Sequence, residues 1–178
     1  MNWLGLHREY LGQGEMGIIV SLLNGIEAKS MTEFGCRDGR TARVLLHNVP
    51  TLERYIGLDV PRTYSPSLSH QLNEMVDEPG HFALSDPRFE LRIRDFGTLD
   101  FVAHELEPCD AVFIDGDHSE SVVSWDSDLA RTIATKLIVW HDYTNAAVEV
   151  KRVLDRLHDD ESWPIKSVEG TWLAFMLI

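Results

Sequence analysis

The sequence of 178 residues predicts an α/β protein: a doubly wound, mostly parallel seven-stranded sheet with helices on both faces and an antiparallel C-terminal strand. First, strand-like apolar runs alternate with helix-like stretches along the chain, as they do in parallel α/β sheets. Second, the length suits one domain with one substantial core. Third, no repeat, low-complexity tract or obvious linker divides the chain, so residues 1–178 are expected to form a single domain.

The first three elements are expected before residue 50. From Met16 to Ile26, apolar residues are dense enough to predict a buried helix. Residues 30–34, SMTEF, form a short strand candidate that runs into Gly35. Residues 41–47, TARVLLH, continue as a helix whose apolar side is formed by Ala42, Val44, Leu45 and Leu46.

The middle of the chain adds two strands and one segment with helical spacing. YIGLDV at 55–60 predicts the second strand, which Pro61 stops because proline cannot donate to a sheet. Residues 63–80 contain two prolines and a polar stretch in which Leu68, Leu72 and Met75 recur at helical spacing. FELRIRDF at 89–96 alternates apolar and polar residues and predicts the third strand.

Two apolar runs in the second half predict the fourth and fifth strands. AVFI at 111–114 and LIVW at 137–140 are apolar throughout, as buried parallel strands are. Residues 119–132 between them predict a helix. Its expected inner face is formed by Val122, Val123, Trp125 and Leu129.

A helix and two consecutive strands close the pattern. AAVEVKRVLDRL at 146–157 carries an apolar stripe opposite a charged face, which predicts an amphipathic helix. Strands are expected over 165–168 and 171–178. In such sheets, ligands bind at the carboxyl ends of the strands, near the point where strand order reverses. A functional site is therefore expected at these strand ends.

The charge balance limits the expected partners. Sixteen Lys and Arg residues stand against 29 Asp and Glu residues, a formal charge of −13. Such a surface repels phosphate backbones and anionic lipid, so neither nucleic acid nor a membrane is an expected partner. No apolar run reaches the roughly 18 residues of a membrane span, and the N-terminus lacks the apolar segment of a signal peptide. A cytoplasmic location is expected, with Cys36 and Cys109 as small buried thiols.

Acidic residues and glycines concentrate where the predicted strands end. FIDGDH at 113–118 places Asp115, Asp117 and His118 directly after a buried strand. At the end of the first strand, EFGCRDGRT has Gly35 and Gly39 framing a tight turn, which lets backbone N–H groups approach a ligand. The glycine spacing fits neither the dinucleotide fingerprint nor the phosphate loop.

Two further acids end strands. Asp59 follows Gly39 by 20 residues and can accept two hydrogen bonds from a ribose diol. Asp95, at the end of the third strand, is then placed to accept from an adenine amino group. The acidic strand ends together predict a ligand that contains a nucleoside.

EFGCRDGRT and YIGLD resemble the first two motifs of class I S-adenosylmethionine (SAM)-dependent methyltransferases, which have a Rossmann-like fold. The chain is most similar to small-molecule O-methyltransferases of the methyltransferase domain 24 type. Their fourth strand typically reads FIDGDH and their fifth ends in His-Asp, here within IVWHDY at 138–143. The similarity extends over nearly the whole chain and implies SAM as the cofactor.

The resemblance also implies which residues bind SAM. The glycine turn shapes the SAM loop, Glu33 supports the methionine end and Asp59 binds the ribose. The segment GQGEMG at 12–17 is expected to fold over the cofactor. The implied cofactor-binding residues are Glu33, Gly35, Cys36, Gly39, Asp59, Asp95 and Asp115.

An alcohol or phenol becomes a good nucleophile once a base takes its proton or a metal lowers its pKa. The resemblance implies a site for Mg²⁺ or Mn²⁺ formed by Asp115, His141 and Asp142, although imidazole favours Mn²⁺ over Mg²⁺. Asp117 is the first candidate for the base, and His118 and His141 are the others. His118 can equally be the residue that begins a helix, with Ser119 as its N-cap.

The expected function is transfer of a methyl group from SAM to a hydroxyl group of a small molecule, such as a sugar, a phenol or a natural-product scaffold, with or without a divalent metal. The alternative is a non-catalytic SAM-binding module with a regulatory or structural role, which would not need the acids of FIDGDH and WHDY. Because the chain has little beyond the core, the acceptor site is either open or completed by a second subunit, and a homodimer is expected in the latter case.

Overall fold

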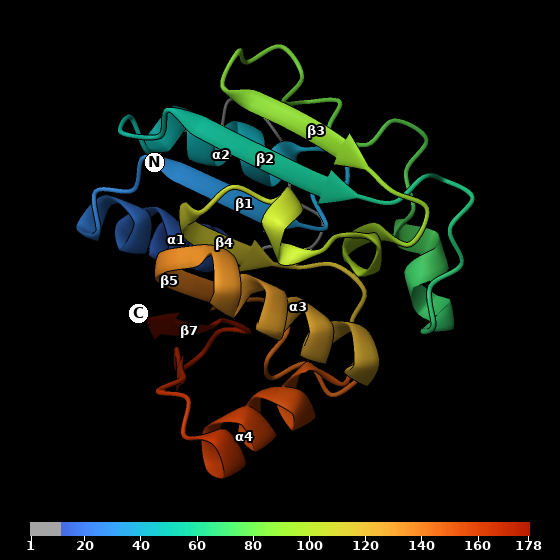
Figure 1. Cartoon of the computed structure of the whole chain (residues 1–178), viewed down its shortest axis with the longest axis vertical. Coiled ribbons are helices and arrows are strands. Elements are labelled where there is room, and N and C mark those ends of the chain that lie inside the picture. Colours follow the sequence, from blue (N-terminus) through green and yellow to red (C-terminus); the bar gives the residue numbers. More distant parts are fainter. Residues whose placement is uncertain (1–11) are drawn as a thin grey trace.

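A seven-stranded sheet organises the computed structural model, which describes residues 12–178 (Figure 1). The strand order is β3-β2-β1-β4-β5-β7-β6. β1 to β5 pair in parallel, whereas β7 pairs antiparallel with β5 and β6. The fold class expected from the sequence is confirmed. The strands are β1 (Ser30–Phe34), β2 (Arg54–Asp59), β3 (Phe89–Ile93), β4 (Cys109–Ile114), β5 (Ala134–Trp140), β6 (Lys166–Ser167) and β7 (Ala174–Leu177).

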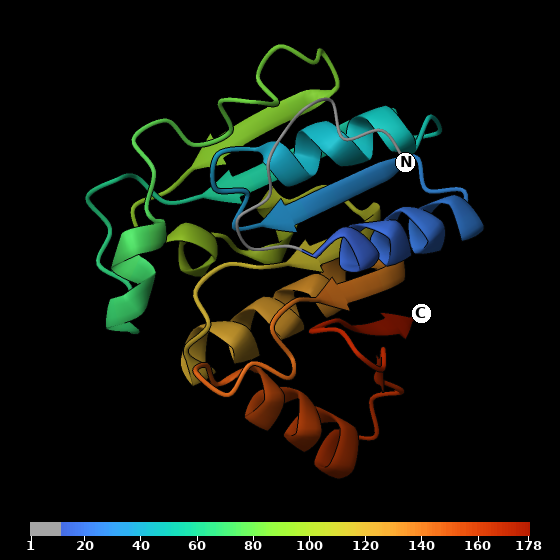
Figure 2. The ribbon, with the colours of Figure 1, turned by 180° about the vertical axis from the view of Figure 1, so that it is seen from behind.

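Helices cover both faces of the sheet, as the two opposite views show (Figures 1 and 2). α1 and α2 pack on one face and α3 and α4 on the other, since alternate strand residues point to opposite faces. In β4, Phe113 joins the core with α1 and α2, and Val112 joins the core with α3 and α4. Among residues 12–178, no helix is both long and apolar enough to cross a membrane. The helices are α1 (Gln13–Gly25), α2 (Arg40–Asn48), α3 (Glu120–Ile133) and α4 (Val150–Glu161).

Strand order reverses at β1. This strand pairs with β2 on one side and β4 on the other, while the chain crosses from β3 to β4 through two 3₁₀ helices, η2 (Gly97–Asp100) and η3 (Ala103–Glu105). Phe34, the last residue of β1, lies opposite Leu58 of β2 and Ile114 of β4. The carboxyl ends of β1, β2 and β4 therefore meet at one edge, which is where open α/β sheets bind ligands.

The segment between β2 and β3 does not form the α-helix that the spacing of its apolar residues indicates. Residues 63–80 hold one short 3₁₀ helix, η1 (Ser69–Glu74), instead of an α-helix. Leu72 is 44% exposed, whereas its neighbour Gln71 is buried. The physical reason is that Gln71 has backbone hydrogen-bond partners at the end of β4, so this segment turns a polar side toward the sheet.

One side chain and two element boundaries also differ from the sequence prediction. Trp125, predicted on the inner face of α3, is 39% exposed, and its indole N–H donates to the carbonyl oxygen of Thr98 at 2.9 Å. β3 ends at Ile93, before the Arg94-Asp95-Phe96 stretch that was assigned to it, and α4 begins at Val150 because the residues before it form turns.

Candidate active site

A cavity opens where the carboxyl ends of β1, β2 and β4 meet. Its empty volume, which includes space open to solvent, is about 780 Å³. The strand-end loops form one wall, and the segment after β2, η2 and α3 form the others. Its lining residues include Gly35, Asp59, Tyr64, Thr98, Asp115 and Asp126.

Gly35 and Gly39 permit two close backbone approaches beside the cavity. Gly35 has a φ of 84°, and a Cβ atom there would lie 2.4 Å from the carbonyl oxygen of Asp115. Gly39 has a φ of 82°, and its Cβ would lie 2.7 Å from the carbonyl oxygen of Gly80. The two glycines thus bring the loop after β1 against the loop after β4 and against the turn before β3.

Asp59 ends β2, as expected from the sequence, and lines the cavity. Its carboxylate accepts hydrogen bonds from the backbone N–H groups of Arg37 and Val60. Burial raises the pKa of Asp59 to about 6, against the effect of these donors. The carboxylate that faces the cavity therefore also ties the loop after β1 to the end of β2.

Three other residues of the predicted cofactor site lie in different surroundings. Glu33 is buried in β1, where the hydroxyl of Tyr55 donates to its Oε2 at 2.9 Å, and burial raises the pKa of both groups. Cys36 is a buried free thiol. Asp95 is exposed, whereas residues 96–98 line the cavity. The roles of Glu33, Cys36 and Asp95 in cofactor binding stay predictions.

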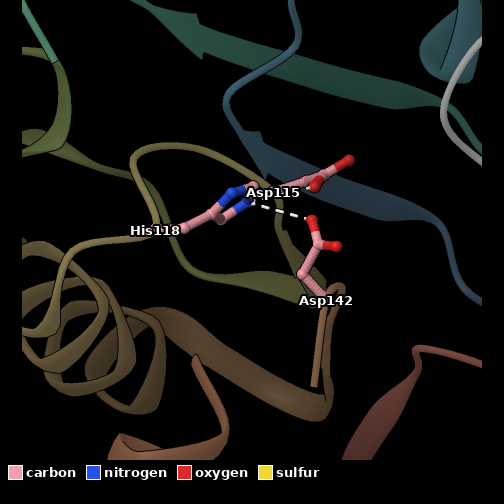
Figure 3. Close-up of side chains that lie close together, drawn as sticks. All are labelled: Asp115, His118 and Asp142. Carbon is pink, nitrogen blue, oxygen red and sulfur yellow. Dashed lines mark ion pairs between the residues drawn. The ribbon is translucent and has the colours of Figure 1, made fainter. Parts of the chain in front are cut away.

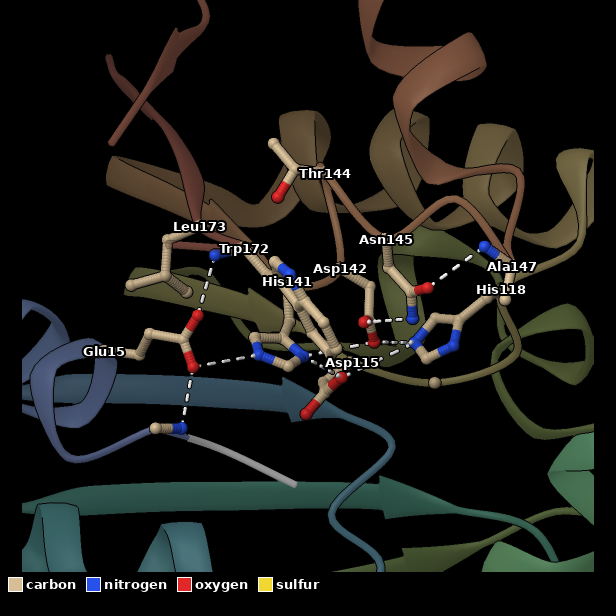
Figure 4. Close-up of polar contacts among 12 residues, drawn as sticks. Glu15, Asp115, His118, His141, Asp142, Thr144, Asn145, Ala147, Trp172 and Leu173 are labelled. Carbon is tan, nitrogen blue, oxygen red and sulfur yellow. Dashed lines mark hydrogen bonds and ion pairs between the residues drawn. The ribbon is translucent and has the colours of Figure 1, made fainter. Parts of the chain in front are cut away.

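Two imidazoles and three carboxylates meet beside the cavity; Figure 3 shows Asp115, His118 and Asp142, and Figure 4 shows all five residues. Asp115 and His118 follow β4, His141 and Asp142 follow β5, and Glu15 comes from α1. His118 Nε2 lies 3.5 Å from Asp115 Oδ1 and 3.4 Å from Asp142 Oδ2. His141 Nδ1 lies 3.2 Å and 3.1 Å from the same two oxygens. Its Nε2 lies 3.6 Å from Glu15 Oε2.

These surroundings favour a positive charge on His141, which is 3% exposed. Burial alone would lower its pKa, but Asp115, Asp142 and Glu15 raise it to about 12. Conversely, burial would raise the pKa of Asp115, and the two imidazoles lower it to about 2. The imidazole of His141 and the backbone N–H groups of Trp172 and Gly12 lower the pKa of Glu15 to about 2. A buried imidazolium thus balances carboxylates that would otherwise repel one another.

Gln71 of η1 orients His118. Its Nε2 donates to the Gly116 carbonyl oxygen at 3.1 Å, and its Oε1 accepts from the His118 backbone N–H at 3.3 Å. These backbone partners define which way the amide points, so its Nε2 also faces His118 Nδ1 at 3.2 Å. In neutral His118, Nδ1 therefore accepts, and Nε2 carries the proton that faces Asp115 and Asp142.

Asp117 connects α3 to the segment after β2. Its Oδ1 accepts from the backbone N–H of Ser119 at 2.9 Å. Its Oδ2 accepts from the hydroxyl of Tyr64 at 3.0 Å and the N–H of Ser67 at 3.3 Å. Burial would raise the pKa of Asp117, but these bonds lower it. Ser119 is the N-cap residue of α3, as the sequence predicts, although its own side chain makes no capping bond.

Asp142 has an unusual backbone conformation. Its φ is 60°, in the left-handed region that non-glycine residues adopt rarely. Asn145 Nδ2 donates to its Oδ1 at 2.8 Å and leaves Oδ2 directed at the two imidazoles, as Figure 4 shows. Such conformations occur preferentially at functional sites, where the surrounding contacts maintain them.

The ligand atoms of Asp115, His118 and Asp142 lie close enough together that they could hold a metal ion (Figure 3). They all lie within 4.8 Å of one another, and two carboxylates with one imidazole suit Mn²⁺ and are tolerated by Mg²⁺. Within the described part of the chain, His118 Nε2 has no hydrogen-bond partner. This group contains His118 where the sequence prediction has His141. A cation there would require the proton to leave His118 Nε2.

The sequence prediction missed three residues of the site. Gln71 carries no periodic signal, because it is one polar residue among many. Glu15 lies within GQGEMG, and its contact with His141 depends on how α1 packs. Asp126 had a visible signal, since it lies four residues after Val122 and three before Leu129, on the apolar stripe of α3.

A family model described as a methyltransferase domain matches residues 32–143. The match begins in β1 and ends just after β5, so it includes the glycine turn and Asp59. The five residues Glu15, Asp115, His118, His141 and Asp142 form the imidazole–carboxylate cluster, and the match includes all of them except Glu15. None of the curated proteins matches the sequence closely enough to count as a relative.

Solved structures similar to this one span nearly the whole chain. The cofactor-bound protein Rv0187 from MTB has a TM-score of 0.67 at 19% identity, over 98% of this chain and 84% of that one. An O-methyltransferase from Bacillus cereus in complex with SAH (S-adenosylhomocysteine) has a TM-score of 0.64 at 13% identity, over 98% and 86%. The O-methyltransferase TomG from Streptomyces achromogenes, involved in tomaymycin synthesis and solved with SAM, has a TM-score of 0.60 at 15% identity, over 94% and 81%. At these identities the likeness concerns the fold.

Proposed function

The chain belongs to the methyltransferase-domain family, and on this premise we propose that it transfers a methyl group from SAM to a hydroxyl group of a small molecule. The observation that carries the proposal is the continuity of one cavity. Gly35 and Asp59, from the predicted cofactor half, line the same cavity as Asp115, from the imidazole–carboxylate cluster. The similar structures from Bacillus cereus and Streptomyces achromogenes, solved with SAH and SAM, support the choice of cofactor and acceptor group.

The residues that line the cavity fit SAM. Asp59 presents a carboxylate to a ribose diol, and the Gly35 turn lets the backbone come close to a ligand. Asp126 is buried and keeps one oxygen, Oδ1, without a hydrogen-bond partner in residues 12–178. The cavity thus offers polar groups from several elements to one extended, polar molecule.

Bound SAM supplies a methyl group already activated by its sulfonium, so the protein has to orient the acceptor and remove its proton. We assign the orienting role to Asp115, because it lines the cavity and its Oδ1 is held by both imidazoles. Asp115 also takes the hydroxyl proton. Although its pKa is low, the attacking oxygen becomes strongly acidic as it gains the methyl group, so a carboxylate suffices late in the reaction.

Asp117 and the two imidazoles then have supporting roles. The oxygens of Asp117 already accept three hydrogen bonds, which favours an anchoring role over that of the base. His118 and His141 hold the carboxylate of Asp115 in place. A divalent cation at Asp115, His118 and Asp142 would lower the pKa of a hydroxyl group bound beside it.

Calorimetry and a transfer assay test the function. SAH should bind the protein, and labelled methyl should pass from SAM to at least one member of a panel of sugars, phenols and natural-product scaffolds. Failure to bind SAH would overturn the proposal. SAH binding with no product from any acceptor would favour the non-catalytic SAM-binding module.

Two matched variants separate the proposed base from its neighbour. Asp115→Asn should lower kcat by about 10²–10⁴-fold, the usual contribution of a general base. Asp117→Asn should leave more of the turnover, because an amide oxygen can still accept part of the hydrogen bonds that Asp117 accepts. If Asp117→Asn abolishes turnover at unchanged SAH affinity, Asp117 is the base, as the sequence predicts.

Cation binding is tested by a readout independent of turnover. Titration of Mn²⁺ followed by electron paramagnetic resonance should give one site, whose affinity rises with pH because protonation of His118 to the imidazolium competes with the cation. His118→Ala should weaken this site strongly, and His104→Ala, an exposed histidine, should not. Equal Mn²⁺ affinity in wild type and His118→Ala would exclude His118 as a ligand.

The remaining expectations concern partners and location. A small-molecule acceptor agrees with the family. The homodimer, the lack of a nucleic-acid or membrane partner and the cytoplasmic location stay predictions from the sequence. Light scattering at several protein concentrations tests the homodimer.

A further inference from the structure

Asp126 is a buried acid that the proposed chemistry does not use. Its side chain is 1% exposed and lines the cavity from the inner stripe of α3. Against the larger effect of burial, the side chain of Thr98 in η2 lowers the pKa of this carboxyl group. Its Oδ1 has no hydrogen-bond partner anywhere in the described chain. Buried polar atoms in folded proteins almost always have partners, so this oxygen calls for a partner from the cavity, either a ligand or a water molecule.

The position of Asp126 relates it to the end of β2. Thr98 follows Gly97, where a Cβ atom would lie 2.9 Å from Cγ1 of Val60, the residue after Asp59. On the other side, Asp126 Oδ2 lies 3.8 Å from the place of a Cβ atom on Gly116. Asp126 is therefore in the cavity wall between η2 and the turn after β4.

A nucleoside held at Asp59 would direct its base toward this wall. The methyl-donating end of SAM must reach Asp115. The adenine therefore extends in the opposite direction, along Val60 and residues 96–98, which line the cavity. Asp126 and Thr98 are the polar side chains that α3 and η2 contribute to this part of the lining.

From this geometry we infer that Asp126 recognises the adenine of the cofactor by accepting a hydrogen bond from its 6-amino group. The inference rests on the proposed function, since it assumes that SAM occupies the cavity. It assigns to α3 a role that the sequence analysis gave to Asp95.

The chemistry of a buried carboxyl group suits the adenine edge. Adenine presents an amino donor beside the N1 acceptor, and a protonated carboxyl group presents an acceptor oxygen beside a hydroxyl donor. Burial raises the pKa of Asp126 to about 7, against the effect of Thr98, so the protonated form is populated at neutral pH. An asparagine would offer the same pair of groups, as it does when it reads adenine in DNA.

Asp95 is a poorer partner for adenine. Its side chain is exposed, so water competes for the carboxylate, whereas Asp126 is shielded from water. A hydrogen bond in such shielded surroundings discriminates more strongly between ligands that have and lack the donor.

A double-mutant cycle between protein and ligand tests the inference. The ligands are SAH and its analogue with hydrogen in place of the 6-amino group, and their affinities are measured by calorimetry. Asp126→Leu should bind SAH about ten- to a hundredfold more weakly than wild type. Wild type should bind the analogue more weakly than SAH, but Asp126→Leu should bind both ligands equally, because the contact is already lost.

Two further variants complete the cycle. Asp126→Asn should retain SAH binding within a few-fold, and Asp128→Leu, an exposed acid two residues along the same helix, should behave as wild type. Thermal unfolding of each variant without ligand separates lost binding from lost folding. If Asp126→Leu does not fold, the inference is tested by Asp126→Asn and by the preference of wild type for SAH over the analogue.

Three results would overturn the inference while leaving the proposed function intact. The first is wild-type SAH affinity in a folded Asp126→Leu variant. The second is additive losses for the variant and the analogue, and the third is coupling of the amino group to Asp95→Ala instead. If wild type fails to bind SAH at all, the proposed function itself is wrong.

Discussion

His141 lies among three carboxylates, and this position explains how so many acids can share one buried site. Its Nδ1 is 3.2 Å from Asp115 and 3.1 Å from Asp142, and its Nε2 is 3.6 Å from Glu15. The sequence shows that His141 and Asp142 are adjacent and end a strand. It does not show Glu15 on the other side, because that contact joins residues from opposite ends of the chain.

The charge on His141 should make stability depend on pH. Its pKa is about 12 in the folded protein against 6.5 for the free side chain, so its contribution is complete below about pH 6.5 and is lost as pH rises toward 12. In metal-free protein with chelator present, the free energy of unfolding of wild type relative to His141→Gln should fall by up to about 1.4 kcal/mol per pH unit above pH 6.5.

Denaturant unfolding at several pH values measures this difference. Glu15 and Asp115 act in the opposite direction, because their lowered pKa values remove stability only as pH falls from about 4.5 toward 2. A difference between wild type and His141→Gln that stays constant from pH 6 to 9 would mean that His141 is neutral.

Gly35→Ala tests whether the glycine turn serves backbone packing. The new Cβ would lie 2.4 Å from the Asp115 carbonyl oxygen, so the loop after β4 would have to move. Gly170→Ala is the matched control, since its φ is 76° but no atom lies within 4 Å of the new Cβ. Gly170→Ala should cost about 1 kcal/mol of stability, and Gly35→Ala clearly more, together with loss of SAH binding. Equal costs in thermal unfolding would show that only the dihedral angle matters.

At the scale of elements, the segment from Pro61 to Val76 covers one side of the cavity with little regular structure of its own. Tyr64 and Ser67 bond to Asp117, and Gln71 bonds to the turn after β4. Figures 1 and 2 show η1 beyond the carboxyl ends of the strands. The conformation of the segment from Pro61 to Val76 depends on these side-chain contacts, so the same residues also determine the shape of this side of the cavity.

Limited trypsin digestion should report on these contacts. Gln71→Ala removes the bonds to Gly116 and His118, and cleavage after the exposed Arg62 should become about tenfold faster. His70→Ala changes an exposed neighbour in the same 3₁₀ helix and should digest like wild type. If Gln71→Ala is cleaved at the wild-type rate, other contacts hold the segment.

At the scale of the whole molecule, one sheet separates two apolar cores. Ile19 of α1 lies in one core and Ile133 of α3 in the other, and both are almost fully buried. Since β1, β4 and β5 contribute residues to both cores, the two should unfold together.

Paired conservative changes test this cooperation. Ile19→Val and Ile133→Val should each cost about 0.5–1.5 kcal/mol, and the double variant should lose the sum within about 0.5 kcal/mol, because the cores do not share contacts. Calorimetry should show one transition in all three variants. Two separate transitions in either single variant would show that the cores unfold independently.

The sequence by itself determined the sheet and its functional edge. Alternating strand and helix patterns, the glycine turn after β1 and the acids at strand ends are local signals, so they predicted the fold class, Asp59 at the cavity and the cluster around Asp115. The same local signals indicated helical spacing for Leu68, Leu72 and Met75 within 63–80 and placed Trp125 on the inner face of α3. There, tertiary contacts of Gln71 and Thr98 outweigh local periodicity.

Only the tertiary structure decided how the acids and imidazoles share their charges. It brought Glu15 to His141 and Gln71 to His118, and it separated Asp117, which anchors a neighbouring segment, from Asp115. The physical reason is that pKa values and hydrogen-bond partners depend on atoms a few ångströms away that come from distant parts of the chain. Spacing along the sequence records which residues end the strands, and packing decides which of them meet.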